Sequence, residues 1–227
     1  MTPTSQHRPK QVTTKVLLVD DHPIVRQGIR MLVDQESDLE VCGEAESEVE
    51  ALRLIEQTQP DIAVVDLSLK GSSGLSLTRE IRTRHPQVQV LVLSMRDEAF
   101  YAERVLRAGA KGYITKEQGS ERIIEGIRKV VAGQIYLSDQ LASKMLKSLV
   151  GGDRPGESPV RRLSDRELAV FELIGHGLTT RDVAKRLHLS VKTVESHREH
   201  IKEKLNLSGA PDLLKYAIQW VQYQGQT

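Results

Sequence analysis

The chain of 227 residues is poor in cysteine and contains no long apolar run. Its one cysteine, Cys42, excludes a disulfide or a cysteine-ligated metal site within one chain, and its surroundings predict a small buried residue on a strand. No apolar stretch approaches the roughly 18 residues that a membrane-spanning helix needs. The first fourteen residues are polar and contain Pro3 and Pro9, so we expect a disordered tail over residues 1–14 rather than a signal peptide. These absences predict a cytoplasmic protein without a membrane partner.

The chain also has little net charge, +1 overall, but the charge is unevenly divided. Residues 1–159 carry a net charge of −2, and residues 160–227 carry +3. A basic segment favours contact with nucleic-acid phosphates, although a charge of this size is a weak signal. The C-terminal part is therefore the expected nucleic-acid-binding part.

Two apolar segments end in carboxylates. Residues 62–65 are apolar on consecutive positions and end at Asp66, which leads into a loop rich in glycine and serine. Residues 15–19 in the same way precede Asp20 and Asp21. All-apolar strands are typical of a parallel sheet buried on both faces. If these strands are neighbours, the three acids meet at one edge of the sheet, where they favour binding of a cation. The alternative is that each acid only caps the following helix.

Apolar strands alternate with amphipathic helices five times before residue 134. The expected strands cover residues 15–19, 40–45, 61–67, 87–94 and 111–115. The intervening helices begin near Pro23, Ser47, Leu75, Glu98 and Ser120. Such alternation predicts an α/β fold in which helices cover both faces of a five-stranded parallel sheet. The flavodoxin-like strand order 2-1-3-4-5 places the first and third strands side by side.

Five polar residues at the ends of four of these strands resemble the site of receiver domains in two-component response regulators. They are Asp20, Asp21, Asp66, Ser94 and Lys116. The resemblance covers about residues 15–133 and predicts a receiver domain over residues 15–134. It implies that Asp66 accepts a phosphoryl group from a sensor histidine kinase. A carboxylate is a competent nucleophile for this transfer.

The same resemblance implies further roles around Asp66. Mg²⁺ is expected on Asp20, Asp21, Asp66 and the backbone carbonyl of Ser68, where it offsets phosphoryl charge. Ser94 and Lys116 are expected to contact the phosphate, and Tyr113 matches an aromatic residue that relatives turn inward on activation. Each has an alternative reading: a strand-end hydroxyl for Ser94, a surface lysine for Lys116 and a half-buried strand residue for Tyr113.

A linker is expected over residues 135–159. Residues 138–149 have helical apolar spacing, and residues 151–159 are dense in glycine and proline with no apolar residue. That composition predicts a flexible connection and a domain boundary.

Residues 160–227 are predicted to be all-helical with four helices. Capping residues at Ser164 and Thr179 open two helices, and a short turn leads into residues 191–205, as in a helix-turn-helix. The inward stripe of this last helix is expected to contain Val191, Val194, Ile201 and Leu205.

Residues 163–207 closely resemble the LuxR-type DNA-binding domain, so that the whole chain resembles a NarL/FixJ-type response regulator. The outward residues expected to contact DNA are Lys192, Thr193, Glu195, Ser196, Arg198, Glu199 and Lys202. Glu195 is expected either to read a base or to pair with Arg198, and Glu199 to pair with Lys202 or to stay solvated. In the family the final helix pairs two DNA-binding domains, which assigns dimerisation to Leu214, Ala217, Ile218 and Val221. Core packing within one domain is the alternative.

The predicted function is a phosphorylation-controlled transcriptional regulator that binds double-stranded DNA as a homodimer when activated. No enzyme activity is expected beyond phosphoryl transfer to Asp66 and its autodephosphorylation. One alternative is a phosphate-independent regulator that uses the receiver only for dimerisation, which the complete set of five polar residues opposes. The other is a Mg²⁺-dependent enzyme acting on a phosphoester, which the short βα loops oppose.

Overall fold

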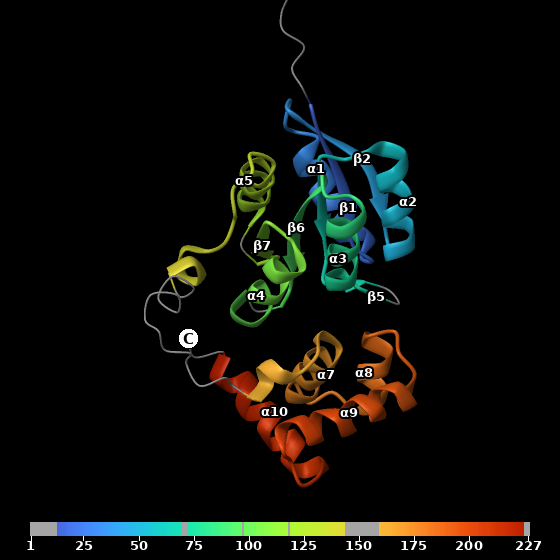
Figure 1. Cartoon of the computed structure of the whole chain (residues 1–227), viewed down its shortest axis with the longest axis vertical. Helices are drawn as coiled ribbons and strands as arrows, with labels where there is room; N and C mark the ends of the chain where they lie inside the picture. Colours follow the sequence, from blue (N-terminus) through green and yellow to red (C-terminus); the bar gives the residue numbers. More distant parts are fainter. Residues whose placement is uncertain (1–12, 70–71, 97, 118, 144–158, 225–227) are drawn as a thin grey trace, which may run out of the picture. The chain divides into compact units, whose positions relative to one another are not determined.

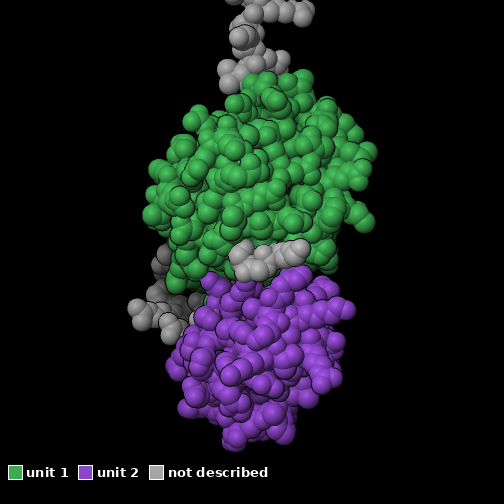
Figure 2. Space-filling view, turned by 90° about the vertical axis from the view of Figure 1, so that its right-hand side faces the viewer, with its two compact units in different colours: residues 1–141 green, residues 142–227 purple. Residues whose placement is uncertain are grey.

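The protein is described here by a computed structural model that covers residues 13–69, 72–96, 98–117, 119–143 and 159–224. The chain divides into two compact units, residues 1–141 and 142–227 (Figure 2). Each unit has its own apolar core. Within the described residues, no helix is both long enough and apolar enough to cross a membrane.

The first unit is built on a five-stranded parallel sheet (Figure 1). Its strands are β1 (Thr14–Val19), β2 (Leu39–Ala45), β3 (Ile62–Val65), β6 (Gln89–Ser94) and β7 (Gly112–Thr115). Their spatial order, β2-β1-β3-β6-β7, confirms the predicted order 2-1-3-4-5. The numbering is interrupted by β4 (Ser68–Leu69) and β5 (Ser72–Ser73), which form a separate antiparallel pair in the loop after Asp66.

Five helices cover the two faces of this sheet. They are α1 (Pro23–Val33), α2 (Glu48–Thr58), α3 (Gly74–Arg84), α4 (Glu98–Ala108) and α5 (Ser120–Val131). α1 packs against α5, whereas α3 packs between α2 and α4 (Figure 1). Successive strand residues alternate between the faces. Val16 therefore joins Ile29 and Ile127 in one core, and Leu17 faces Leu54 of α2 near Gly43.

Two stretches at the edges of the first unit differ from the expectations. β1 begins at Thr14, inside the stretch expected to be a disordered tail, and residues 1–12 lie outside the described part of the chain. Residues 135–141, expected in the linker, pack with the first unit, because the Tyr136 backbone pairs with the edge strand β7. The second half of the expected linker helix and all but the last residue of the Gly/Pro segment fall in residues 144–158, outside the described residues.

The second unit is helical, as predicted. It consists of a 3₁₀ turn, η1 (Pro159–Arg162), followed by α7 (Asp165–Gly175), α8 (Thr180–Arg186), α9 (Val191–Leu205) and α10 (Ala210–Gln224). Both expected capping boxes are present, Ser164 with Glu167 on α7 and Thr179 with Asp182 on α8. The fully buried ring of Phe171 lies in the core, with the rings of Tyr216 and Trp220 packed against it.

Candidate functional site

Carboxylates from two neighbouring strands meet at the carboxyl edge of the sheet. Asp20 follows β1 and Asp66 follows β3, and the Asp66 backbone N–H donates a 2.8 Å hydrogen bond to the Val19 carbonyl between them. Both side chains are buried, with 4% exposed for each, while Asp21 is 13% exposed. The adjacency of β1 and β3 thus brings the three predicted acids together.

Lys116 and Ser94 reach the same edge of the sheet from the ends of β7 and β6. Lys116 Nζ lies 2.5 Å from Asp20 Oδ2 and 3.4 Å from Asp66 Oδ1. The Lys116 backbone N–H donates to the Ser94 carbonyl at 2.9 Å, which fixes the ends of β6 and β7 beside each other. The buried Ser94 Oγ accepts a 3.2 Å hydrogen bond from the Arg96 N–H, which leaves the hydroxyl proton for a second partner.

The electrostatics of this site disfavour an ionised Asp66. The pKa of the Asp66 carboxyl is raised to about 6, chiefly by burial and also by the neighbouring Asp20 charge, while the Lys116 charge and hydrogen bonds from Lys116 and the Ser68 backbone N–H oppose the rise. A site of this kind gains from an added cation that neutralises the acids.

The donor atoms fit Mg²⁺, which prefers carboxylate oxygens. One potential ligand atom from each of Asp20, Asp21, His22 and Asp66 lies within 4.8 Å of the others. His22, to which the sequence assigned no role, places Nδ1 2.8 Å from Asp21 Oδ1 and 3.1 Å from Asp20 Oδ1. Its position directly after the two aspartates was the only available signal, because backbone adjacency alone does not fix where an imidazole points.

Tyr113 is buried rather than half-buried, with only 1% of its surface exposed. Its hydroxyl donates a 2.7 Å hydrogen bond to the Arg96 carbonyl. The Arg96 guanidinium in turn donates to the Tyr101 hydroxyl at 2.6 Å and lies 3.4 Å, at Nε, from Ser68 Oγ. Sequence alone does not show this chain of contacts, because it joins three separate elements.

Gly74 sets the close approach of α3 to the loop that carries Asp66. A Cβ atom on Gly74 would lie 2.0 Å from the Asp66 carbonyl oxygen. The Gly74 N–H donates to the Leu67 carbonyl at 3.0 Å, and Ser73 caps the helix through the Leu75 N–H. A side chain at this position is therefore excluded by backbone atoms.

The second candidate site is the helix-turn-helix of α8 and α9. The turn between them contains His188 with a positive φ of 52°, and Ser190 caps α9 by accepting from the Thr193 N–H. Val194, Ile201 and Leu205 are buried as predicted, but Val191 is 40% exposed. The assignment of Val191 to the inward stripe was wrong, because this residue lies in the first turn, at the N-terminal end of the helix.

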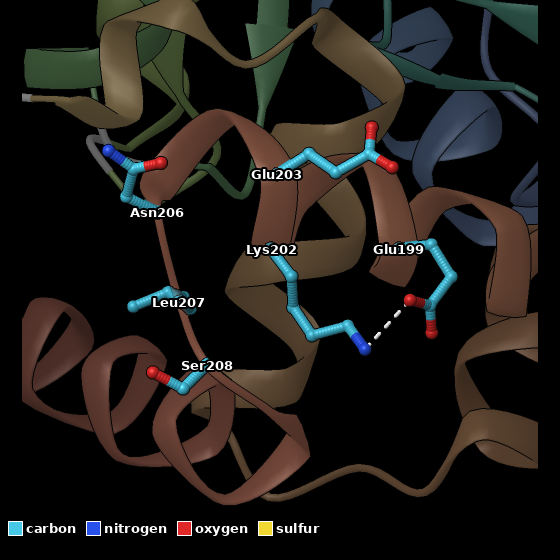
Figure 3. A pocket seen from close by; sticks show the side chains of 6 residues that line it. All are labelled: Glu199, Lys202, Glu203, Asn206, Leu207 and Ser208. Atoms are coloured by element: carbon cyan, nitrogen blue, oxygen red, sulfur yellow. Dashed lines mark ion pairs between the residues drawn. The ribbon is translucent and has the colours of Figure 1, made fainter.

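The residues expected to contact DNA include both fully exposed and partly covered side chains. Those exposed on α9 are Lys192, Glu195, Ser196 and Glu199, whereas Thr193, Arg198 and Lys202 are partly covered. Lys202 Nζ pairs with Glu199 at 2.8 Å, one of the two arrangements that the spacing predicted (Figure 3). Among the described side chains of α9, Glu195 forms no ion pair with Arg198. The pairing expected between these two residues is therefore absent.

A surface depression lies at the C-terminal end of α9. It has a volume of about 400 Å³ and is lined by Glu199, Lys202, Glu203, Asn206, Leu207 and Ser208. Figure 3 shows Glu199 and Lys202 turned toward each other along one side of it. Its lining is mixed in charge.

Only part of the expected dimerisation stripe on α10 is open to a partner. Leu214 is 42% exposed and Ile218 and Val221 are partly covered, but Ala217 is fully buried. The Ala217 carbonyl oxygen lies 2.5 Å from the position a Cβ on Gly175 would occupy, so α10 packs closely on α7 there. The assignment of Ala217 to a dimer surface is therefore corrected to core packing within the unit.

Comparison with known proteins matches both units. Residues 16–128 match the response regulator receiver domain, and residues 161–217 match the bacterial regulatory proteins of the luxR family. The chain is 39% identical over 209 residues to the oxygen regulatory protein NreC of Staphylococcus carnosus (strain TM300), covering 90% of this chain and 96% of that protein. The NreC protein of Staphylococcus epidermidis (strain ATCC 35984) is 38% identical over 210 residues, with the same coverage.

The solved structures that this chain resembles also include response regulators. One structure of the Salmonella typhimurium RcsB response regulator has a TM-score of 0.65 at 25% identity, covering 91% of this chain and 98% of that one. RcsB of Salmonella enterica serovar Typhimurium, bound to the promoter rprA in the presence of phosphomimetic BeF₃⁻, has a TM-score of 0.60 at 25% identity, covering 90% and 98%. The chain therefore belongs to the NarL/FixJ-type response regulators, in which a receiver domain is joined to a LuxR-type DNA-binding domain.

Proposed function

We propose that this response regulator accepts a phosphoryl group on Asp66 from a sensor histidine kinase and then binds double-stranded DNA as a homodimer. The observation that carries the proposal is the buried Asp66 carboxyl, with Lys116 Nζ 3.4 Å away and the acids Asp20 and Asp21 beside it. A nucleophile, a fixed cation and a cation-binding set thus lie together at one edge of the sheet.

Transfer requires an oxygen of Asp66 to form a bond to phosphorus while the P–N bond to the donor histidine breaks. When bound by Asp20, Asp21, Asp66 and the Ser68 carbonyl, Mg²⁺ supplies positive charge that offsets the phosphoryl oxygens. Lys116 supplies a second positive charge from the end of β7, at the same edge of the sheet, and the Ser94 hydroxyl is placed to donate to a phosphoryl oxygen. Together these contacts bias the receiver toward its active state.

α9 is the proposed DNA-recognition helix, with Lys192, Thr193, Glu195, Ser196, Arg198, Glu199 and Lys202 as its contact residues. Support comes from its exposed polar face, from the helix-turn-helix geometry, and from relatives of the same family, since RcsB has been solved bound to promoter DNA. A recognition helix enters the major groove, where side chains reach base edges.

Phosphate labelling tests the first half of the proposal. Incubation with a radiolabelled small-molecule phosphodonor and Mg²⁺ should label the wild-type chain, and Asp66→Asn or a chelator should abolish the label. Asp38→Asn is the matched control, because Asp38 pairs with Arg128 on the surface just before β2 begins, away from the carboxyl edge of the sheet. Full labelling of Asp66→Asn would show that another residue is the acceptor.

Dimerisation through α10 is tested by a pair of adjacent leucines. Leu214→Ala removes exposed apolar surface and should weaken the activated dimer in sedimentation velocity while the unit stays folded. Leu213 is fully buried, so Leu213→Ala should instead destabilise the unit by about 2–5 kcal/mol. An unchanged dimer in folded Leu214→Ala would remove α10 from the interface.

A further inference from the structure

The chain that leaves the receiver is held at two places only two residues apart. Tyr136 pairs with β7, because its N–H donates to the Lys111 carbonyl at 2.9 Å and its carbonyl accepts from the Tyr113 N–H at 2.9 Å. Its hydroxyl also donates to Glu125 Oε2 on α5 at 2.9 Å. The first attachment is therefore anchored in the sheet and in α5.

The second attachment belongs to a different element. Glu98, the first residue of α4, accepts a 2.9 Å hydrogen bond on Oε1 from the Ser138 backbone N–H, although 40 residues separate them. Only 9% of Glu98 is exposed. Ser138 Oγ accepts from the Leu141 N–H at 3.2 Å, and Leu141 is itself 7% exposed. Glu98 thus fixes the first turn of the segment that leads to the second unit.

Glu98 also lies close in sequence to the candidate phosphorylation site. Ser94 ends β6, its hydroxyl accepts from the Arg96 N–H, and the Arg96 carbonyl accepts from buried Tyr113. The Arg96 backbone is thus held by the Ser94 hydroxyl and by the Tyr113 hydroxyl, two residues before α4 begins at Glu98. The Tyr136 attachment rests on the backbone of β7 and on α5, and it meets this path only at Tyr113, whose N–H donates to the Tyr136 carbonyl.

We propose that Glu98 is a positioning residue that reports the state of the Asp66 site to the DNA-binding unit through its hydrogen bond to Ser138. The inference rests on the proposed function, since it names the route by which phosphorylation regulates DNA binding. Tyr136 serves as the fixed pivot, and the contact between Glu98 and Ser138 is the part that changes when the 94–98 segment moves.

The test compares DNA affinity of the full chain with and without beryllium fluoride and Mg²⁺, using a DNA site selected from a random pool. In the wild type, the fluoride should tighten binding by a factor on the order of 5–150, the usual range for coupled sites. Glu98→Ala should reduce that factor to about 1–2, while phosphodonor labelling of Asp66 stays at the wild-type level. Glu98→Gln keeps an acceptor oxygen for the Ser138 N–H and should retain most of the factor.

Glu103→Ala is the matched control, because Glu103 lies on the same helix and pairs with Arg107 at 2.7 Å. It should leave the factor unchanged. Amide hydrogen exchange of residues 136–143 gives a direct readout, since the Ser138 N–H is itself the donor. Fluoride should raise exchange there in the wild type and have no effect in Glu98→Ala.

The outcomes separate the two proposals. If the wild type responds to fluoride and folded Glu98→Ala responds equally, the Glu98 route is wrong while the proposed function stands. If the wild type shows no response although Asp66 is labelled, phosphorylation does not control DNA binding, and both proposals fail.

Discussion

The Arg96 guanidinium reaches across the mouth of the Asp66 site to Ser68, with Nε 3.4 Å and Nη2 3.5 Å from Ser68 Oγ. Ser68 stands two positions after Asp66, and Arg96 stands two positions after Ser94. In receivers these two positions flank the path of an attacking water. Neither side chain offers a carboxylate or an amide that would orient water for hydrolysis.

We therefore expect a long-lived phosphoryl group on Asp66. Ser68→Asn or Arg96→Glu supplies a water-orienting group and should speed loss of label several-fold, as measured by the decay of labelled protein after removal of the phosphodonor. Slower decay in either variant would mean that the Arg96–Ser68 contact does not protect the phosphoryl group.

Gly74→Ala should destabilise the first unit, because the added methyl group would lie 2.0 Å from the Asp66 carbonyl oxygen. Relief requires a backbone shift, which costs about 1–3 kcal/mol and also displaces Asp66. Urea unfolding and phosphodonor labelling should both show the loss. Gly28→Ala on α1 is the control: nothing lies within 4 Å of the new methyl group, and stability should rise by about 0.5–1 kcal/mol.

Stability should depend on pH through Asp66. Burial, with a contribution from Asp20, raises the pKa of this carboxyl from 3.8 to about 6 in the folded chain. The folded state then binds its proton more tightly than the unfolded state, so stability falls as pH rises from about 4 to about 6. Above that range, without a divalent cation, the ionised carboxylate costs up to about 3 kcal/mol.

Asp66→Asn removes this charge and should be more stable than the wild type in chelator at pH 8, with little difference at pH 4. Mg²⁺ should stabilise the wild type and leave the variant nearly unchanged. Denaturant unfolding at both pH values measures the difference, and a less stable variant at pH 8 would mean that burial of the charge is fully compensated by Lys116.

On α9, Glu195 and Lys202 should have opposite effects on DNA binding. Glu195→Ala removes an exposed carboxylate, so affinity for random DNA should rise while discrimination at one base pair drops by about 1–3 kcal/mol. Lys202→Ala should weaken all sequences alike and reduce the salt slope by roughly one. An unchanged selected sequence for Glu195→Ala would eliminate base reading, and the missing pair with Arg198 leaves Glu195 as a solvated residue.

Much of the fold follows from local patterns in the sequence. Apolar runs with helices between them predicted the parallel sheet, but they do not give its strand order. The order 2-1-3-4-5 was expected because it places the first and third strands side by side, so that Asp20 and Asp66 meet. Capping residues such as Ser164 and Thr179 marked helix starts correctly, because a cap depends on residues within one turn.

The unpredicted features depend on contacts between distant residues. The hydrogen bond from Ser138 to Glu98 spans 40 positions, and neither residue belongs to a motif that shows the pairing. Helical spacing placed Ala217 on an apolar side of α10, but periodicity does not tell whether that side meets its own domain or a second copy. Val191 failed for a different reason: the end of a helix projects beyond the core that its later turns cover.

DNA binding measured with and without occupation of Asp66 tests the central claim most directly. Wild-type protein and Asp66→Asn are each titrated onto a selected DNA site in Mg²⁺, with and without beryllium fluoride, and the complexes are footprinted. The account predicts that fluoride tightens wild-type binding and yields two half-sites about one helical turn, ~10 base pairs, apart, while Asp66→Asn does not respond. Equal wild-type affinity under both conditions would contradict it and favour a regulator whose receiver serves only for dimerisation.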